Sequence, residues 1–348
     1  MKTQTLAAMS LAAGAINAMP YDSQFPKHTI KRASDIADGT DVAVFWGQST
    51  SDLSDVCADD SFDTVIMAFI TSLNPPKLNL GKDTGSASDA QSAQAGWELF
   101  DGTVAGANGK SIADQINDCQ GAGKKVMISF GGDSRYSNAT FASADEAKQA
   151  ADYLWKTSEL MDILRDLFLG GTGSQDLRPF GSNVVLDGVD FDNESGDGSY
   201  YTDLVTELRG KMSSNSTKSY YLSAEPMCSF YDQSDSSIPD AILPSLDFVN
   251  IQFYNNEAQG IGGSDFKTTI QGWAKKFASV SPSPKLFLGV PGGEGAASTN
   301  IQSPDEIKTT IQSVRNMNIT GFGGVGIWDA GYAMKNDGFQ AAVKSALA

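Results

Sequence analysis

Three acidic residues alternate along one short segment in the middle of the chain. Residues 186–194 read LDGVDFDNE, which places Asp190, Asp192 and Glu194 two positions apart. Because side chains in a strand alternate between faces, these three project to one side, about 6–7 Å apart along the chain. Mutual repulsion and desolvation in such a column raise some of the pKa values. A protonated glutamate is the general acid that cleavage of a glycosidic bond requires, so Glu194 is a candidate for that role.

Other interpretations of these acids stay open on spacing alone. Acidic residues at the end of a strand are often part of a solvated loop, and clustered carboxylates indicate catalysis only statistically. A calcium-binding loop is a further alternative, although the segment lacks the ligand order and the glycine of an EF-hand.

Histidine is nearly absent, which narrows the chemistry. The only histidine is His28, and none follows residue 32. A Ser-His-Asp triad, a Cys-His pair and a histidine-ligated zinc site are therefore excluded beyond that point. Acid–base chemistry falls to carboxyl groups, tyrosine or lysine, and we expect neither a metal nor a cofactor.

The first residues resemble processing segments. A basic start and a short apolar stretch that ends in small residues predict a signal peptide over residues 1–18, with a disordered or helical N-terminus of a cytosolic protein as the alternative. The pair Lys31-Arg32 predicts a pro-segment over residues 19–32, although a chance basic pair would look the same. We therefore expect a secreted protein whose catalytic domain spans residues 33–348. Sequons for N-glycosylation stand at Asn138, Asn193, Asn215 and Asn318.

The chain is strongly acidic. Its 348 residues carry a formal net charge of −17, and four of the 25 basic residues lie before residue 33. Such a surface repels nucleic acid and anionic lipid, so we expect neither as a partner. The charge suits an extracellular protein with a neutral or cationic substrate, and we expect a monomer.

The elements that must position the acids follow a repeating pattern. Short runs rich in Val, Ile, Leu and Phe alternate with helical stretches, which is typical of parallel strands covered on both faces. The pattern predicts an α/β protein with a single (β/α)8 TIM barrel, and a doubly wound open sheet is the alternative. A barrel would hold the acids inside, rising to its C-terminal mouth. The runs are 42–46, 64–70, 125–130, 184–191, 220–224, 248–254, 286–290 and 323–328.

Helix starts are readable at two places. Ser303 is a candidate cap before Pro304 at the first helical position and two acids in the first turn. The segment from Ser143 to Glu146 reads as a capping box. The predicted helices are 143–169, 200–211, 266–277, Pro304–Asn316 and 338–346.

With these elements in place, residues 41–345 resemble glycoside hydrolase family 18, in its class III, hevamine-like branch of secreted chitinases. The segment Asp187-x-x-Asp190-x-Asp192-x-Glu194 matches the full acidic signature of that family, and 129–132 (SFGG) matches its Ser-x-Gly-Gly motif. Further similar segments are 45–48 (FWGQ), 252–256 (QFYNN) and 323–328.

The resemblance implies an endo-acting chitinase that retains configuration on β-1,4-linked N-acetylglucosamine polymers. By resemblance, Glu194 protonates the glycosidic oxygen while the acetamido carbonyl of the sugar attacks its own anomeric carbon, forming an oxazolinium ion. Asp192 orients the acetamido group, Asp190 shares a proton with Asp192, and Tyr254 donates a hydrogen bond to the acetamido oxygen. Chitin or a chitooligosaccharide is thus the expected substrate.

The resemblance also assigns binding and structural residues. Trp328 forms the hydrophobic floor beneath the sugar, and the peptides Ala68-Phe69 and Trp328-Asp329 are expected to be cis. Cys57 and Cys119 are expected to form a disulfide, which leaves Cys228 as a free, buried thiol. The other substrate-binding candidates are Gln252, Asn255, Phe45, Gln48, Phe69, Gly132 and Glu225, and the motif residues with a structural role are Asp187, Ser129 and Gly131.

Three positions depart from the pattern of this branch. Phe45 stands where tyrosine is common, and Glu225 stands where hevamine-like chains have a small residue before proline. We expect the extra acid near the mouth, where it could alter subsite preference or the pH optimum. Asn193 lies inside the acidic motif, where a glycan would block substrate, so we expect its sequon to be unmodified.

Two other functions fit the same signature. One is an endo-β-N-acetylglucosaminidase acting on N-glycans, against which the segments 46–48 and 252–256 argue. The other is a non-catalytic chitin-binding or inhibitor protein on the same barrel. Such relatives usually lose the acid glutamate, whereas this chain keeps Glu194.

Overall fold

The computed structural model describes residues 39–49, 51–74, 76–80, 103, 105, 108–155, 169, 179–181, 183–214 and 218–348. The predicted signal peptide and pro-segment, His28, the sequon at Asn215 and positions 156–168 of the longest predicted helix lie outside these residues.

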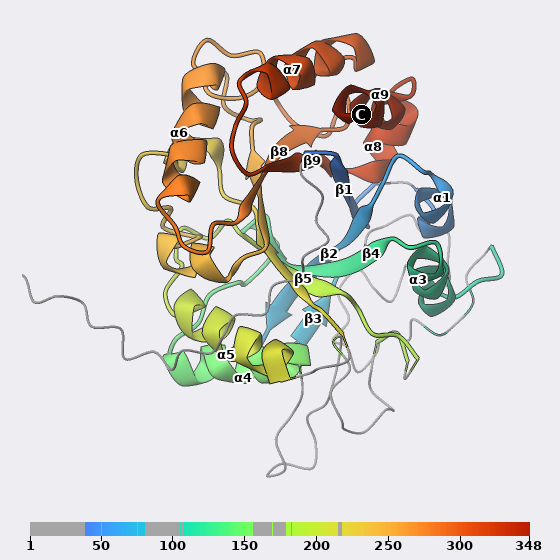
Figure 1. Ribbon diagram of the computed structural model, residues 1–348. Helices are drawn as coiled ribbons and strands as arrows, with labels where there is room; N and C mark the ends of the chain where they lie inside the picture. Colours follow the sequence, from blue (N-terminus) through green and yellow to red (C-terminus); the bar gives the residue numbers. More distant parts are fainter. Residues whose placement is uncertain are drawn as a thin grey trace, which may run out of the picture.

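Eight parallel strands close into a barrel, which confirms the (β/α)8 prediction over an open sheet (Figure 1). Closure is direct, because β1 pairs in parallel with both β2 and β9. Each predicted apolar run overlaps one barrel strand. The strands are β1 (Asp41–Trp46), β2 (Thr64–Leu73), β4 (Lys125–Gly132), β5 (Gly188–Asn193), β6 (Tyr221–Ala224), β7 (Phe248–Gln252), β8 (Lys285–Pro291) and β9 (Phe322–Trp328).

Two details of the strands differ from the prediction. The short strand β3 (Pro76–Leu78) pairs antiparallel with the end of β2 and was not expected. The run 184–191 begins four residues before β5, since Val184 and Leu186 are buried without joining the ladder. An apolar run in the sequence indicates which residues are buried, and before β5 the buried residues begin earlier than the strand pairing does.

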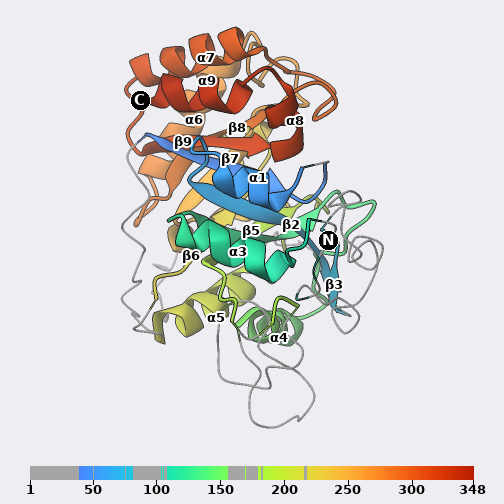
Figure 2. The same cartoon turned by 90° about the vertical axis from the view of Figure 1, so that its right-hand side faces the viewer.

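The helices lie outside the strands (Figures 1 and 2). All five predicted helices have a counterpart. Ser303 caps its helix as predicted, and the structure adds a reciprocal hydrogen bond to Glu306 that completes a capping box. The short helices α1 and α8, and α3 with its own capping box at Ser111, were not predicted. The helices are α1 (Leu53–Ala58), α3 (Ile112–Gly121), α4 (Ala144–Trp155), α5 (Tyr201–Ser214), α6 (Phe266–Ala278), α7 (Pro304–Asn316), α8 (Ala330–Lys335) and α9 (Phe339–Leu347), with 3-10 turns η3 (Cys228–Phe230) and η4 (Asp240–Ser245).

Strand alternation divides the buried side chains between two apolar cores. Along β1, Val42 and Val44 join the large core shared with the helices, whereas Ala43 and Phe45 join a small core inside the barrel. The inner core fills the barrel with Met127, Tyr221, Phe248, Phe287 and their neighbours. The remaining inward positions are polar, and they form the site described below.

The cysteines pair as expected. Cys57 of α1 and Cys119 of α3 form a disulfide, and Cys228 is a buried free thiol. Burial raises the pKa of Cys228 to about 11, so this thiol is unreactive at neutral pH. Among the described residues, no helix has the length and apolar composition that a membrane crossing needs.

A buried ion pair fixes the starts of β6 and β7, which carry part of the site. Arg209 of α5 contacts Asp247 at 2.5 Å and also donates to the carbonyl oxygens of Ser245 and Tyr220. The same Asp247 carboxylate accepts the backbone N–H of Leu222 at 2.8 Å. Both charged side chains are nearly excluded from water.

Because Asp247 would remain buried without its cation, Arg209→Leu should reduce the free energy of unfolding by about 3–5 kcal/mol. Urea unfolding monitored by tryptophan fluorescence measures the change. The control is Lys110→Ala, which removes an ion pair to Asp118 whose two side chains are each 51% exposed. Solvent screens that pair, so its removal should leave the unfolding midpoint unchanged. Equal midpoints for the two variants would contradict the role of Arg209.

Candidate active site

The acidic column lies on the inner face of β5. The parallel ladders pair Asp190 with Ser129 of β4 on one side and with Ser223 of β6 on the other. Asp190 is completely buried, Asp192 is 7% exposed, and Glu194 reaches solvent at the C-terminal mouth. The three acids thus share one face and rise from the barrel interior to its mouth, as their spacing predicts.

Asp190 is held by two hydroxyl groups. The Ser129 hydroxyl donates to one carboxyl oxygen at 2.6 Å, and the Ser223 hydroxyl donates to the other at 2.5 Å. Burial raises the pKa of Asp190, and these hydrogen bonds oppose the rise because they stabilise the ionised form. Hydrogen bonds therefore stabilise the carboxylate of Asp190 more than that of its buried neighbour Asp192.

Asp192 has far fewer donors. The side-chain amide of Gln252 in β7 donates to it at 3.2 Å and is shared with Glu194 at 3.4 Å. Desolvation raises the pKa of Asp192 well above its usual range, and the charges of Glu194 and Asp190 raise it further. The ionised form of Asp192 is therefore less stabilised than that of Asp190.

Glu194 sits where the column meets solvent. The surrounding walls still desolvate its carboxyl group, and this desolvation raises the pKa of Glu194. Gln252 opposes the rise through its hydrogen bond, Asp133 adds to it through its charge, and Arg135 opposes it. A glutamate that stays protonated above its ordinary pKa and faces solvent can deliver a proton to a bound molecule.

Tyr254 lies just beyond β7 and is partly buried among these acids. Desolvation raises the pKa of Tyr254 well above 10, and the charges of Asp192 and Glu225 raise it further. The phenol therefore remains protonated and can donate a hydrogen bond to a group held at the mouth.

Aromatic side chains form one wall of the mouth. Trp328, at the end of β9, stacks with Phe69 at 5.6 Å between ring centroids and meets Phe45 edge-on at 5.5 Å. The peptides Ala68-Phe69 and Trp328-Asp329 are both cis, as expected. Aromatic faces of this kind pack against the C–H groups of sugar rings.

The two glycines of the Ser-x-Gly-Gly segment are required by close contacts. A Cβ on Gly131 would lie 2.0 Å from the Asp192 carbonyl oxygen, and the backbone there has a φ of 129°. A Cβ on Gly132 would lie 2.9 Å from the Phe69 ring. Gly131 therefore lets β4 approach the acidic strand, and Gly132 makes room for the aromatic wall.

Glu225 lies deeper than the sequence suggested. It directly follows β6, is 5% exposed, and accepts a hydrogen bond from the side-chain amide of Asn250 at 2.7 Å. Desolvation raises the pKa of Glu225 well above its usual range, and the charges of Asp190 and Asp192 add to the rise. The extra acid is part of the buried column and does not line the open mouth.

Other predicted residues support the site from outside it. Asp187 lies at the opposite end of β5 from the mouth, where it accepts the Val126 N–H at 2.7 Å and pairs with Lys218 at 2.9 Å. The Gln48 amide donates to the carbonyl oxygen of Ala68 at 2.7 Å. Asn255 accepts the Ser298 N–H at 2.7 Å, which ties down the loop after β8.

The sequon inside the acidic motif is inaccessible in this fold. Asn193 is 3% exposed, and its side-chain nitrogen donates to the carbonyl oxygens of Asp197 and Ser237. A glycan attached to that nitrogen would break both hydrogen bonds, in line with the expectation that this sequon is unmodified.

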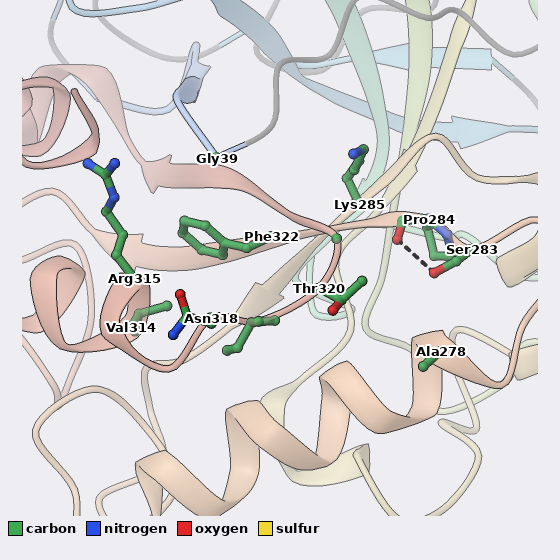
Figure 3. Close-up of a pocket in the computed structure, with 12 residues that line it drawn as sticks. Gly39, Ala278, Ser283, Pro284, Lys285, Val314, Arg315, Asn318, Thr320 and Phe322 are labelled. Carbon is green, nitrogen blue, oxygen red and sulfur yellow. Dashed lines mark hydrogen bonds between the residues drawn. The ribbon is translucent and has the colours of Figure 1, made fainter.

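A pocket of about 690 Å³ lies at the other end of the barrel, around the first residues of β8 and β9 (Figure 3). Lys285 and Arg315 are the charged residues among its described lining, and none of these described lining residues carries a carboxyl group. The described lining therefore lacks the acids that the column offers.

Sequence reasoning missed four polar residues of the site. Ser223 and Asn250 could have been found, because each lies two positions before a predicted site residue, Glu225 and Gln252, and so shares its face. Asp133 and Arg135 lie in the loop after β4, where they pair at 2.5 Å. No periodic signal indicates their approach to Glu194.

The chain is similar to chitinases in sequence and structure. The model of the glycosyl hydrolases family 18 matches residues 41–303. Endochitinase 3 of Metarhizium robertsii is 32% identical over 312 residues, which cover 88% of this chain and 90% of that protein. The crystal structure of ICChI chitinase from Ipomoea carnea has a TM-score of 0.68 and 26% identity, covering 88% of this chain and 99% of that one.

The same fold also occurs in an inhibitor. The xylanase and α-amylase inhibitor protein XAIP-II from Scadoxus multiflorus has a TM-score of 0.69 and 25% identity, with coverage of 88% of this chain and 99% of that one. The barrel alone therefore does not decide between catalysis and inhibition, and the side chains of the column must.

The close approach at Gly131 can be separated from the cost of its backbone conformation. Gly123→Ala places a Cβ at a φ of 85° with no atom within 4 Å, so it should cost about 1 kcal/mol of stability. Gly131→Ala adds a clash with the Asp192 carbonyl and should cost roughly 1–3 kcal/mol more. Chemical unfolding of both variants measures the difference, and equal losses would show that β4 and β5 do not need this contact.

Proposed function

The chain belongs to the glycosyl hydrolases of family 18, and from that premise we propose that it is a retaining, endo-acting chitinase. Its substrate is a β-1,4-linked N-acetylglucosamine polymer. The observation that carries the proposal is the position of Glu194, which faces solvent above the buried acids Asp192 and Asp190 and whose pKa is raised by desolvation. The similarity to Endochitinase 3 along most of both chains supports the choice of substrate.

The first step breaks the glycosidic bond with help from the substrate itself. Glu194 donates its proton to the glycosidic oxygen, and the departing sugar leaves with that proton. The carbonyl oxygen of the 2-acetamido group forms a bond to the anomeric carbon, which gives an oxazolinium ion. Asp192 accepts the acetamido N–H and stabilises the positive charge that develops there, while the Tyr254 hydroxyl donates to the acetamido oxygen and holds it in line.

The second step restores the enzyme. Glu194, now ionised, removes a proton from a water molecule that attacks the anomeric carbon on the face vacated by the leaving group. The oxazolinium ring opens, and the product keeps its original configuration because two inversions have occurred. Trp328 supports the reacting sugar from below, since its indole faces the mouth beside Phe45 and Phe69.

Secretion is part of the proposal. The Cys57–Cys119 disulfide suits an oxidising compartment, and the basic start followed by an apolar stretch at the N-terminus is typical of a signal peptide. A secreted chitinase meets its polymeric substrate outside the cell.

Inhibition without catalysis is the second candidate function, because XAIP-II has the same fold. A defined chitooligosaccharide separates the two, since only an enzyme cleaves it. The anomer of the first product tests the substrate-assisted route, and a high-mannose glycoprotein tests action on N-glycans. An inverted product would overturn the mechanism, and cleavage of the glycoprotein alone would overturn the substrate.

Glu194→Gln should lower kcat on chitooligosaccharides by at least about 10²-fold, because glutamine cannot donate a proton to the leaving oxygen. Binding of the same oligosaccharide, measured by calorimetry, should survive. Glu207→Gln on the outer helix α5 is the matched control and should keep full activity. A Glu194→Gln variant as active as the control would rule out Glu194 as the acid.

Neutralising Asp133 and neutralising Arg135, the two charged residues beside Glu194, should move the alkaline limb of the pH–rate profile in opposite directions. Activity is lost as pH rises through the raised pKa of Glu194, because the acid must be protonated. Asp133→Asn removes a negative charge and should shift the limb to lower pH, whereas Arg135→Gln should shift it to higher pH. Solvent screens both groups, so each shift should be small and should shrink at high salt. Shifts of the same sign would contradict the assignment.

A further inference from the structure

Glu225 continues the parallel ladder beyond β6 and meets the acidic strand from the side. Its backbone N–H donates to the Phe191 carbonyl oxygen at 3.0 Å, which extends the register that pairs Ser223 with Asp190. The Glu225 side chain therefore points into the barrel, level with Asp192 and one step above Ser223. This position puts a fourth carboxyl group into the column.

The groups around this carboxyl are acids and neutral polar groups. Asp190 and Asp192 of β5 and Asn250 of β7 face the Glu225 carboxyl group. Tyr254, the second residue after β7, interacts with its charge. Glu194 stands further up the same column. None of these neighbours is a cation, so a charge on Glu225 would have no counter-ion among them.

The side chains of Asp190 and Glu225 hydrogen-bond to each other, whereas Asp190 acts on Asp192 through its charge. Two carboxyl groups in contact must share a proton, since two carboxylates would repel each other. Two serine hydroxyls donate to Asp190 and favour its ionised form. Glu225 receives only the Asn250 amide, at Oε1. The proton therefore resides on Glu225, which donates it to Asp190.

We propose that Glu225 is a positioning residue that enters the site as a neutral carboxylic acid and hydrogen-bonds to Asp190, leaving Asp192 free to serve the substrate. With hydrogen bonds from Ser129, Ser223 and Glu225, Asp190 does not need to draw a proton from Asp192. Asp192 then keeps its hydrogen bond from Gln252, which also donates to Glu194, close to where the acetamido group binds. The consequence for turnover rests on the proposed chitinase function.

Two substitutions of Glu225 distinguish a neutral carboxylic acid that positions Asp190 from an ionised carboxylate. Glu225→Gln keeps the shape and a donor to Asp190, so kcat should stay within about threefold of the original and the alkaline limb should not move. Glu225→Ala removes the donor, so Asp192 should turn toward Asp190 and kcat should fall about tenfold or more. Rescue by glutamine but not by alanine is the expected pattern. A Glu225→Gln limb displaced by about one pH unit would show that Glu225 is ionised, and an unimpaired Glu225→Ala would show that it positions nothing.

Infrared spectroscopy of the substrate-free protein at neutral pH provides a readout that does not depend on turnover or on the alanine variant folding. The carboxylic acid C=O band should lose the contribution of one group in Glu225→Gln, and a different component in Glu194→Gln. An unchanged band in Glu225→Gln would overturn this inference even if the protein cleaves chitooligosaccharides. Loss of that component in a protein that cleaves none of them would uphold the protonated Glu225 and overturn the chitinase function instead.

Discussion

The interior of this barrel holds four carboxyl groups and must limit how many of them are charged. Ionised carboxylates are costly away from water unless donors or cations surround them. The structure meets this constraint with neutral donors: hydroxyls from Ser129 and Ser223, and amides from Asn250 and Gln252. The donors are unequal in number, so among the buried acids Asp190 carries charge most easily and Glu225 keeps the proposed proton. The acid chemistry of the mouth depends on this distribution.

Strand alternation makes that polar interior compatible with a stable fold. Residues that point outward from the strands build the large apolar core with the helices, and that core excludes the carboxyl groups. The inner core of Met127, Tyr221, Phe248 and Phe287 occupies the rest of the barrel interior. The polar side chains inside the barrel can therefore serve catalysis, because the outward-facing side chains supply most of the hydrophobic stabilisation.

The sequence predicts what depends on local pattern and misses what depends on contacts. Eight apolar runs give eight strands because burial on both faces demands them, and the cap at Ser303 is encoded within four residues. The helix α3 was not predicted, although its buried residues Ile112, Ile116 and Cys119 recur at helical spacing. The approach of Asp133 and Arg135 to Glu194 arises from the path of a loop, which no periodicity records. The resemblance to a known family supplied the roles at the mouth, whereas the depth of Glu225 needed the register of β6 against β5.

That depth explains how the barrel accommodates an acid at position 225, where the resemblance to the class III branch leads one to expect a small residue. An added glutamate would normally bring a charge into the column and raise the pKa values of all its neighbours together, because interacting sites titrate as a set. Glu225 instead arrives beside the one carboxylate that hydroxyl groups already stabilise, so it adds a proton to the column and no net charge. The neutral Glu225 thus adds no charge beneath Asp192 and Glu194. It serves as the carboxyl hydrogen-bond partner of Asp190 in place of Asp192. The column can accommodate an acid at position 225 because the hydroxyl groups of Ser129 and Ser223 stabilise the ionised form of Asp190. The shared proton therefore stays on Glu225.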